Sequence, residues 1–411
     1  MTDTVSDTAA SVPKAITCRK IGEVFVTALW LGLTSFGGPI AHIGYFERTY
    51  VRQRRWVSPQ DFTGLVALCQ MIPGPASSQL GYLIGLKRAG WGGALAAWLG
   101  FTLPSALLMF GFALLAPKLG GPRAAAALHG LMLVAIPVVA QAVWNMARSL
   151  GPGRPRIAIA LCSAAVVLMV KTPAIQSMAL AIGLVGGLLL CRDIAARTGV
   201  PNLPVGKPLG IGALALFLIL LVGLPFLASP SRHSIASVVG IFYRSGALVF
   251  GGGHVVLPLL RDALVPTGWL PDTTFLAGYG AAQAMPGPLF TFAAYLGPAA
   301  APHGASLGTL ALWSAAALTA IFLPGLLIAM AGGAVWNWVG HHALARGALA
   351  GVNAAVVGIL GAALYTPVWT SAVASTADIA IVVLAFFLLE RWRLPPIGVV
   401  AFTLSASLLV A

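Results

Sequence analysis

Two short stretches of the chain combine polar residues with helix-breaking ones in a pattern that could bind an anion. Residues 70–75 read Gln-Met-Ile-Pro-Gly-Pro and residues 283–288 read Gln-Ala-Met-Pro-Gly-Pro, and we call them the PGP motifs. Proline suits the first position of a helix because its missing N–H would be unbonded there. Each motif therefore predicts that a helix begins directly after it. The unbonded N–H groups and the positive dipole end at such a start attract anions.

Polar side chains beside the PGP motifs extend this set of donors. Serines follow the first motif, a threonine follows the second, and both motifs begin with a glutamine that carries an amide N–H. Neutral donors around two helix starts suit a tetrahedral oxyanion and do not suit a bare cation. The residues that we assign to substrate binding here are Gln70, Pro73, Gly74, Pro75, Ser77, Ser78, Gln283, Pro286, Gly287, Pro288 and Thr291.

A second pair of motifs precedes the first. Residues 35–39 read Ser-Phe-Gly-Gly-Pro and residues 249–253 read Val-Phe-Gly-Gly-Gly, and we call them the FGG motifs. Non-helical backbone inside a membrane persists only where protein or a water-filled cavity satisfies its polar groups. The histidine that follows each motif could donate to an anion or carry a proton, although ordinary packing explains either histidine equally well. The binding residues assigned here are Gly37, Gly38, Pro39, His42, Gly251, Gly252, Gly253 and His254.

A single basic residue inside an apolar run completes the candidate site. Arg244 lies six residues before Phe250, and a charge in the middle of a membrane segment costs about 2.5 to 3.5 kcal/mol even on the lenient insertion scale. A charge kept at that cost usually faces a cavity or a partner, so we expect Arg244 to attract the anion. The alternative is that it reaches the membrane interface or pairs with Glu23 or Asp262.

Other basic residues cluster outside the apolar runs. Clusters of this kind orient a membrane protein, since Lys and Arg are enriched in cytoplasmic loops. A positive cluster at the mouth of a site also collects anions. The residues expected to form such a vestibule are Arg48, Arg52, Lys87 and Arg88.

Composition places the whole chain in a bilayer. Of its 411 residues, 59% are hydrophobic and 8% are charged, too few charges to cover a soluble globule. The formal net charge of +14 lies in short loops between apolar runs, so it does not indicate nucleic-acid binding. The four cysteines and the histidines have no metal-ligand spacing, so we expect no cofactor, no metal site and no enzyme. The expected location is the inner (plasma) membrane, where lipid surrounds the protein. The sequence does not decide between a monomer and a homodimer.

The order of apolar segments predicts an all-α integral membrane protein made of two homologous halves. Matched residues accompany the motifs: Trp56 corresponds to Trp269, and Leu103-Pro104 corresponds to Leu323-Pro324. We expect a cytoplasmic tail at residues 1–20 and halves at 21–230 and 231–411. Counting runs that approach bilayer thickness, the expected apolar segments are 22–45, 62–85, 91–116, 124–147, 157–170, 174–191, 208–228, 235–260, 275–297, 306–333, 347–369, 376–389 and 395–411.

Charge predicts that the two halves have inverted topology. The loop after the first FGG motif carries four arginines, whereas the corresponding loop of the second half has only Arg261, so the positive-inside rule places the two loops on opposite sides. Making the Gly/Pro-broken segments re-entrant leaves more of the Lys and Arg residues inside. We therefore expect re-entrant hairpins with a motif at each tip. The alternative, in which the motifs are only kinks that let helices pack closely, does not explain four motifs at matched spacing.

The ordered motifs resemble those of the chromate transporter family in its long, two-half form. The resemblance rests on residues 35–42, 68–81, 248–253, 280–288 and 351–358 and extends from about residue 20 to 370. Arg244 stands where the family often has lysine, and His254 stands where it often has tyrosine. The resemblance implies chromate as substrate, with sulfate as a competing look-alike.

Chromate efflux that gives chromate resistance is the function we expect. A membrane potential that is negative inside drives a dianion outward by about 4.6 kcal/mol per 100 mV, so coupling to protons through His42 or Glu23 is not required. One alternative is an importer of sulfate or another oxyanion, and another is a channel. A membrane-embedded oxidoreductase is disfavoured because the sequence has no cofactor motif.

Overall fold

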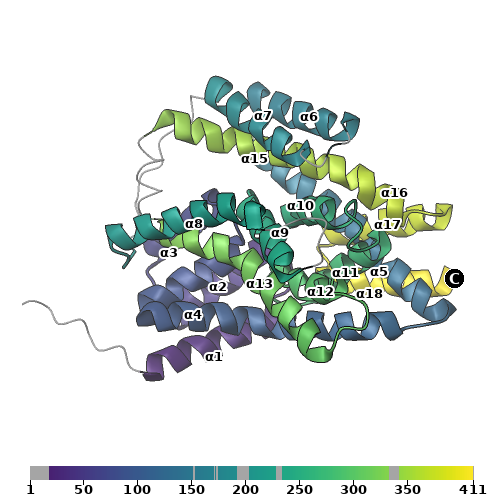
Figure 1. Cartoon of the computed structure of the whole chain (residues 1–411), viewed down its shortest axis with the longest axis horizontal. Helices are drawn as coiled ribbons and strands as arrows, with labels where there is room; N and C mark the ends of the chain where they lie inside the picture. The colour runs from purple at the N-terminus through teal and green to yellow at the C-terminus, as the bar shows by residue number, and fades with distance from the viewer. Residues whose placement is uncertain are drawn as a thin grey trace, which may run out of the picture.

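The structure is a computed structural model that describes residues 18–150, 153–170, 172, 175–191, 203–227, 234–332 and 342–410. Every regular element in these residues is a helix, and most helices run roughly along the long axis of the molecule (Figure 1). Helix α1 begins at Cys18, so the tail predicted for residues 1–20 lies almost wholly outside the described part.

Five helices in the described part are long and apolar enough to cross a membrane. Large apolar side chains on their outer faces are exposed, as at Ile219 and Phe226 of α8 (Lys207–Leu227), which is what a lipid-facing surface requires. The protein is therefore a multi-pass membrane protein, as its composition predicts. The five spans are Ala76–Lys118, Pro122–Arg148, Lys207–Phe226, Leu307–Met330 and Ala343–Ala372.

The first FGG motif lies at the tip of a helical hairpin. Helix α1 leads into the motif, and α2 with the following π-helical turn η1 leads away from it. Arg54, just past η1, lies 3.6 Å from the carboxylate of Glu23 near the start of α1. The two arms of the hairpin therefore end side by side. These elements are α1 (Cys18–Thr34), α2 (Gly38–Phe46) and η1 (Glu47–Gln53).

The first PGP motif lies at the tip of a second hairpin, formed by α3 (Pro59–Met71) and the first part of α4 (Ala76–Leu115). Lys87 Nζ in α4 lies 2.8 Å from Asp61 Oδ2 at the start of α3, which brings the open ends of this hairpin together. Arg88 Nη2 also bonds Glu23 at 3.0 Å, so both hairpins open at the same end of the molecule. These contacts fit the predicted re-entrant arrangement.

Helix α4 contains a reversal at the break that the sequence predicts between the apolar segments 62–85 and 91–116. Gly90 has φ +65° and ψ −154°, and Ala89 before it is also non-helical. The chain folds back here, so that Gly85 packs against the backbone of Gly93. Residues 91–115 then run antiparallel to residues 76–88. A positive φ with so close a helix contact requires small residues at this point.

The second half repeats the same path. Its FGG motif joins α9 to a short 3-10 turn, η3, and α10, and its PGP motif joins α11 to another, η4, and α12. Tyr295 Oη in α12 donates to the carbonyl of Thr274 near the start of α11 at 3.0 Å, which closes the PGP hairpin. The elements are α9 (Ile235–Ala247), η3 (Gly253–Val255), α10 (Val256–Leu264), α11 (Asp272–Ala284), η4 (Leu289–Thr291), α12 (Phe292–Ala299) and α13 (Leu307–Met330).

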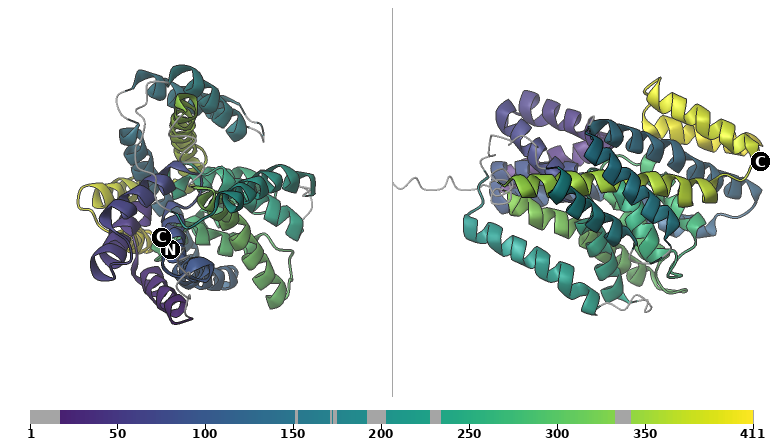
Figure 2. Two further views of the ribbon diagram at one scale, coloured as in Figure 1. Left: turned by 90° about the vertical axis from the view of Figure 1, so that its left-hand side faces the viewer. Right: turned by 90° about the horizontal axis from the view of Figure 1, so that it is seen from above.

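The two halves exchange their outer helix pairs. Helix α5 of the first half packs on α17 and α18 of the second, where Ser407 Oγ donates to the carbonyl of Ala126 at 2.8 Å. Helix α15 of the second half packs on α6 and α7 of the first, with Gly351 against Gly183 (Figures 1 and 2). Neither half is therefore a separate globule. The helices are α5 (Pro122–Ser149), α6 (Arg154–Met169), α7 (Ile175–Leu190), α15 (Ala343–Ala363), α17 (Thr376–Glu390) and α18 (Pro396–Val410).

Candidate functional site

Two reciprocal backbone hydrogen bonds bring all four motifs together. The N–H of Gly74 in the first PGP motif donates to the carbonyl of Val249 in the second FGG motif at 2.8 Å. The N–H of Gly287 in the second PGP motif donates to the carbonyl of Ser35 in the first FGG motif, also at 2.8 Å. Ser35 and Val249 occupy matching positions of the repeat. Each PGP tip is thus bonded to the FGG break of the other half, with a pseudo-twofold relation between them.

The two PGP tips also pack on matching helices. A Cβ added to Gly74 would lie 2.8 Å from the Cα of Gly325 on α13, and one added to Gly287 would lie 3.0 Å from Ser105 Oγ on α4. Both glycines have positive φ, +118° and +91°. Ser105 and Gly325 each directly follow a proline inside a helix. The geometry therefore demands glycine at both tips.

A small cavity of about 50 Å³ lies where the second PGP tip meets the first FGG break. Five of the predicted site residues line it, with α5 and the start of α18 completing the wall. Gln283 is buried and its Nε2 has no hydrogen-bond partner in the described part of the chain. His254 Nδ1 lies 2.8 Å from Tyr279 Oη. The predicted residues in this wall are Gly37, Gly38, His254, Gln283 and Gly287.

The first PGP motif leads into a helix as predicted. Pro75 is the residue before the first turn of α4, and Ser77 and Ser78 are buried in that turn. Ser78 Oγ has no partner among the described residues. Gln79, which the sequence analysis missed, donates from Nε2 to the carbonyls of Pro73 (2.7 Å) and Gly325 (2.9 Å). Its position, in the first turn after the motif, was the available signal.

The second PGP motif also leads directly into a helix, as predicted. After Pro288 the first turn is the 3-10 helix η4, and it continues into α12, which begins at Phe292. The helix start after this motif therefore has 3-10 geometry for three residues. Thr291 Oγ1 donates to the carbonyl of Pro288 at 2.8 Å, so its proton is already used within the turn. Pro286 and Pro288 are both buried at the tip.

The remaining residues near the motifs lie in several environments. His42 is 1% exposed, contacts the ring of Phe101 edge-on, and has no partner for either ring nitrogen in the described residues. Gln70 is exposed at the end of α3. Gly251 and Gly252 form the break before η3, with φ +75° and +149°, and Gly253 is the first residue of η3. The side chain of Pro39 lies outside the described part.

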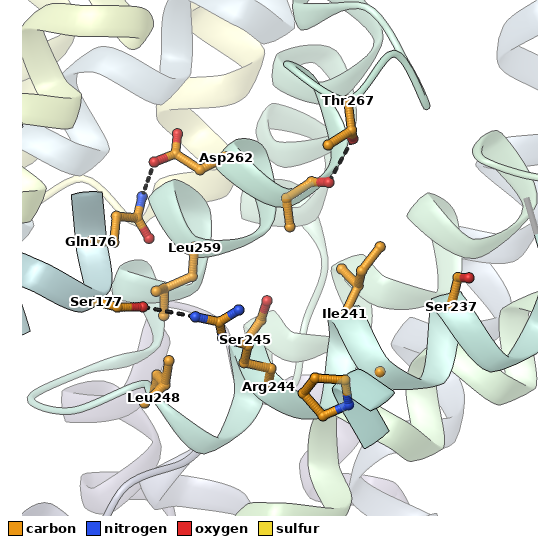
Figure 3. A pocket seen from close by; sticks show the side chains of 13 residues that line it. Gln176, Ser177, Ser237, Ile241, Arg244, Ser245, Leu248, Leu259, Asp262 and Thr267 are labelled. Atoms are coloured by element: carbon orange, nitrogen blue, oxygen red, sulfur yellow. Dashed lines mark hydrogen bonds between the residues drawn. The ribbon is translucent and has the colours of Figure 1, made fainter. Parts of the chain in front are cut away.

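Arg244 does not line the cavity of Gln283. It lies on α9 and borders a larger cavity of about 220 Å³, where its Nη2 donates to Ser177 Oγ of α7 at 2.8 Å (Figure 3). Residues two apart on a helix point about 200° away from each other. Gly246 packs directly against α13, so Arg244 faces the opposite way, toward α7. Arg244 and the predicted residues around Gln283 thus border two different cavities.

Comparison with known proteins identifies the family. The family model described as "Chromate transporter" matches residues 22–190 and 236–409. The chain belongs to this family. The two matched stretches coincide with the two repeats, and α8 lies between them. The resemblance to the chromate transporter family that the motifs indicated is therefore confirmed.

Several curated relatives carry matching names. A chromate transport protein of Pseudomonas aeruginosa is 28% identical over 347 residues, which are 83% of this chain and 79% of the relative. One of Cupriavidus metallidurans is 26% identical over 391 residues, 94% of this chain and 92% of the relative. A probable chromate transport protein of Synechococcus elongatus is 27% identical over 295 residues, 71% and 72% respectively. No solved structure matches this chain.

The basic residues expected to form a vestibule are mostly paired in this chromate transporter family member. Arg52 lies 2.8 Å from Glu47, while Lys87 and Arg88 hold the ends of the hairpins through acidic residues of α3 and α1. Arg48 is exposed. Lys87 and Arg88 thus join the hairpin ends, whereas the Arg52–Glu47 pair lies within η1. No group of three or more potential metal ligands occurs among the described residues.

Proposed function

We propose that this protein exports chromate across the inner membrane and that the substrate binds where the PGP tips meet the FGG breaks. The observation that supports this most is the meeting of all four motifs through the Gly74–Val249 and Gly287–Ser35 hydrogen bonds. Buried donors without partners, at Gln283 and Ser78, lie on these tips. An unpaired buried donor is costly, and a bound oxyanion would satisfy it.

The proposed binding mode uses neutral donors. Gly38 begins α2 and lines the Gln283 cavity, so its end of that helix offers unbonded N–H groups beside the Gln283 amide. Neutral donors bind a dianion by hydrogen bonds alone. Because no fixed positive charge holds the ion, it can also leave the site. The cavity of about 50 Å³ has room for one or two waters. Binding of an oxyanion therefore requires the tip to withdraw, which would break the Gly287–Ser35 hydrogen bond.

The pseudo-symmetry supplies a second gate. Breaking the Gly287–Ser35 hydrogen bond would open the site toward one side of the membrane. Breaking the matching Gly74–Val249 hydrogen bond would open it toward the other side. This works only if the two halves are inverted. Inversion follows if residues 91–115, α5, α6, α7 and α8 each cross the membrane, because that gives five passages between the hairpins of one half and those of the next. Two of these helices, α6 and α7, have only 16 residues each. An odd number of crossings reverses the orientation.

Cysteine labelling tests the inverted arrangement. In a chain whose four native cysteines are replaced, Arg52→Cys and Lys87→Cys should both be labelled only from the cytoplasmic side, because both lie at the open ends of the first-half hairpins. Asp272→Cys should be labelled only from outside. Labelling of all three positions from one face would exclude inversion, and labelling of positions 52 and 87 from opposite faces would exclude the hairpins.

Removing one hydroxyl tests the role of the PGP helix start. Ser78→Ala should weaken chromate affinity by about 1 to 3 kcal/mol if the hydroxyl bonds the charged substrate. Thr291→Ala should have a smaller effect, because that hydroxyl already donates to Pro288. The measurement is the concentration dependence of chromate transport, normalised to inserted protein. Equal or absent effects of the two substitutions would remove Ser78 from the site.

The direction of transport follows from the membrane potential. Chromate is a dianion at neutral to alkaline pH, and an interior-negative potential drives two charges outward by about 4.6 kcal/mol per 100 mV. The membrane potential alone therefore supplies enough free energy for chromate efflux, and no coupling ion is required. Cells that express the protein should accumulate less chromate than cells without it and should grow at higher chromate concentrations. Greater accumulation on expression would instead indicate an importer.

A further inference from the structure

A second cavity of the described structure is separate from the cavity lined by Gln283. It has a volume of about 220 Å³ and is bordered by α7, α8, α9 and α10. Its polar wall residues are Gln176 and Ser177 from α7, Ser237, Arg244 and Ser245 from α9, Asp262 from α10, and Thr267 after α10 (Figure 3). Because a water molecule takes about 30 Å³ in the liquid, the cavity has room for a small anion with part of its hydration shell.

Arg244 brings an uncompensated positive charge to this cavity. No carboxylate lies within 4.0 Å of its guanidinium in the part of the chain that the structure describes, and its one hydrogen bond there goes to the neutral Ser177 hydroxyl. A guanidinium has five N–H donors arranged in a fork that matches an oxyanion. Four of them remain available. The hydroxyl of Ser245 follows directly on the same helix and also lines the cavity.

The acidic residue of the same cavity is bound by other groups. Asp262 accepts a hydrogen bond from Gln176 Nε2 at 2.6 Å, and its other oxygen lies 3.7 Å from Arg261 Nη1. Figure 3 shows how neighbouring residues of α7 keep the two charges apart, with Gln176 on Asp262 and Ser177 on Arg244. The hydrogen-bond donors that remain free on the charged side chains of this cavity are therefore the N–H groups of Arg244.

We infer that the Arg244 cavity is a second binding site for a tetrahedral oxyanion group, separate from the site at the motifs. Leu248 forms part of its wall, and the next residue, Val249, accepts the hydrogen bond from Gly74. An ion bound at Arg244 thus lies beside one of the two proposed gates. One source of this ligand is the free oxyanion that the protein transports, and this part of the inference rests on the proposed function. A phospholipid phosphate has the same chemistry and could arrive beside the lipid-facing helix α8.

Binding without transport tests this site. Lipid-free purified protein is equilibrated with radiolabelled sulfate, and separately with chromate, and bound ion is counted by equilibrium dialysis. The background is Gln283→Glu, whose added charge is expected to empty the motif site. One site should remain, and Arg244→Gln should weaken it about 10- to 150-fold, because hydrogen bonds to a charged group are lost. Arg244→Lys should stay within about tenfold, and the exposed Arg123→Gln serves as a matched control.

A substitution at Asp262 gives a result of opposite sign. Asp262→Asn removes a negative charge from the cavity wall and should tighten oxyanion binding about two- to fivefold. If Arg244 does not bind the oxyanion, Asp262→Asn would leave oxyanion binding unchanged. That outcome would overturn the inference.

A lipid arm separates the two sources of the ligand. Native mass spectrometry of protein taken directly from membranes should show a bound phospholipid that Arg244→Gln loses if a headgroup occupies the site. Either Arg244-dependent ligand, free oxyanion or phospholipid, supports the site. If Arg244→Gln changes neither oxyanion binding nor bound phospholipid, the inference is overturned. Protein with an intact Gln283 can still bind chromate at the motif site in that case, so failure of this inference is distinct from failure of the proposed function.

Discussion

Gln283→Glu is expected to weaken chromate binding at least a thousandfold and to abolish transport. The substitution keeps the shape of the side chain but puts a negative charge beside the expected position of a dianion. At 4 Å and an effective dielectric constant of 20, each pair of like charges costs about 4 kcal/mol, and chromate carries two charges. Few single substitutions change a binding free energy by that much without changing volume.

The matched experiment compares Gln283→Glu with Gln283→Leu and Gln53→Glu. Leucine removes the amide donor without adding charge, so it should cost only about 1 to 3 kcal/mol. Gln53 is exposed on η1, and glutamate there should leave transport unchanged. Lower pH should restore part of the activity of Gln283→Glu, because a protonated carboxyl no longer repels the anion. Normal flux through Gln283→Glu would place the substrate elsewhere.

Gly74→Ala is expected to have the second largest effect, through the assembly of the two halves. Its φ of +118° is strained for any residue with a Cβ, at about 1 to 3 kcal/mol. The new methyl group would also lie 2.7 Å from Gln79 Nε2 and 2.8 Å from the Cα of Gly325, and overpacking of this kind adds about 1 to 3 kcal/mol. Together these are a large fraction of the stability of a typical protein.

The measurement is the thermal unfolding temperature of the purified protein in detergent, with the yield of monodisperse protein beside it. Both should fall for Gly74→Ala and, by the pseudo-symmetry, for Gly287→Ala. The matched control is Gly44→Ala in α2, where nothing lies within 4 Å of the added Cβ. If Gly74→Ala and Gly44→Ala unfold at the same temperature, the PGP tip can move aside. The hydrogen bond from Gly74 to Val249 would then not hold the two halves together.

Much of this fold was accessible from the sequence because it depends on local chemistry. Runs of three Gly and Pro residues disfavour a helix, so the tips at residues 35–38 and 72–75 could be predicted from local sequence. Repetition of the motifs then predicted two matching halves, which the family match confirms. The reversal at Gly90 lies in the break predicted between the apolar segments 62–85 and 91–116. Its role depends on the contact between Gly85 and Gly93.

The arrangement of the site was less accessible, because it depends on packing between distant segments. Nothing in the sequence indicates that each PGP tip bonds the FGG break of the other half, 175 residues away for Gly74 and Val249. Arg244 lies close to the second FGG motif along the chain, yet it faces α7, because the packing of Gly246 on α13 fixes the rotation of α9. Neither fact can be derived before the helices are packed.

Chromate flux in proteoliposomes under an imposed potential tests the central claim most directly. The protein is reconstituted with equal chromate concentrations on both sides, and flux is measured together with current, normalised to inserted protein. We expect saturable chromate flux that carries net negative charge, reverses when the potential is reversed, and is absent for Gln283→Glu. Protein that inserts correctly but moves no chromate under either polarity would contradict the account.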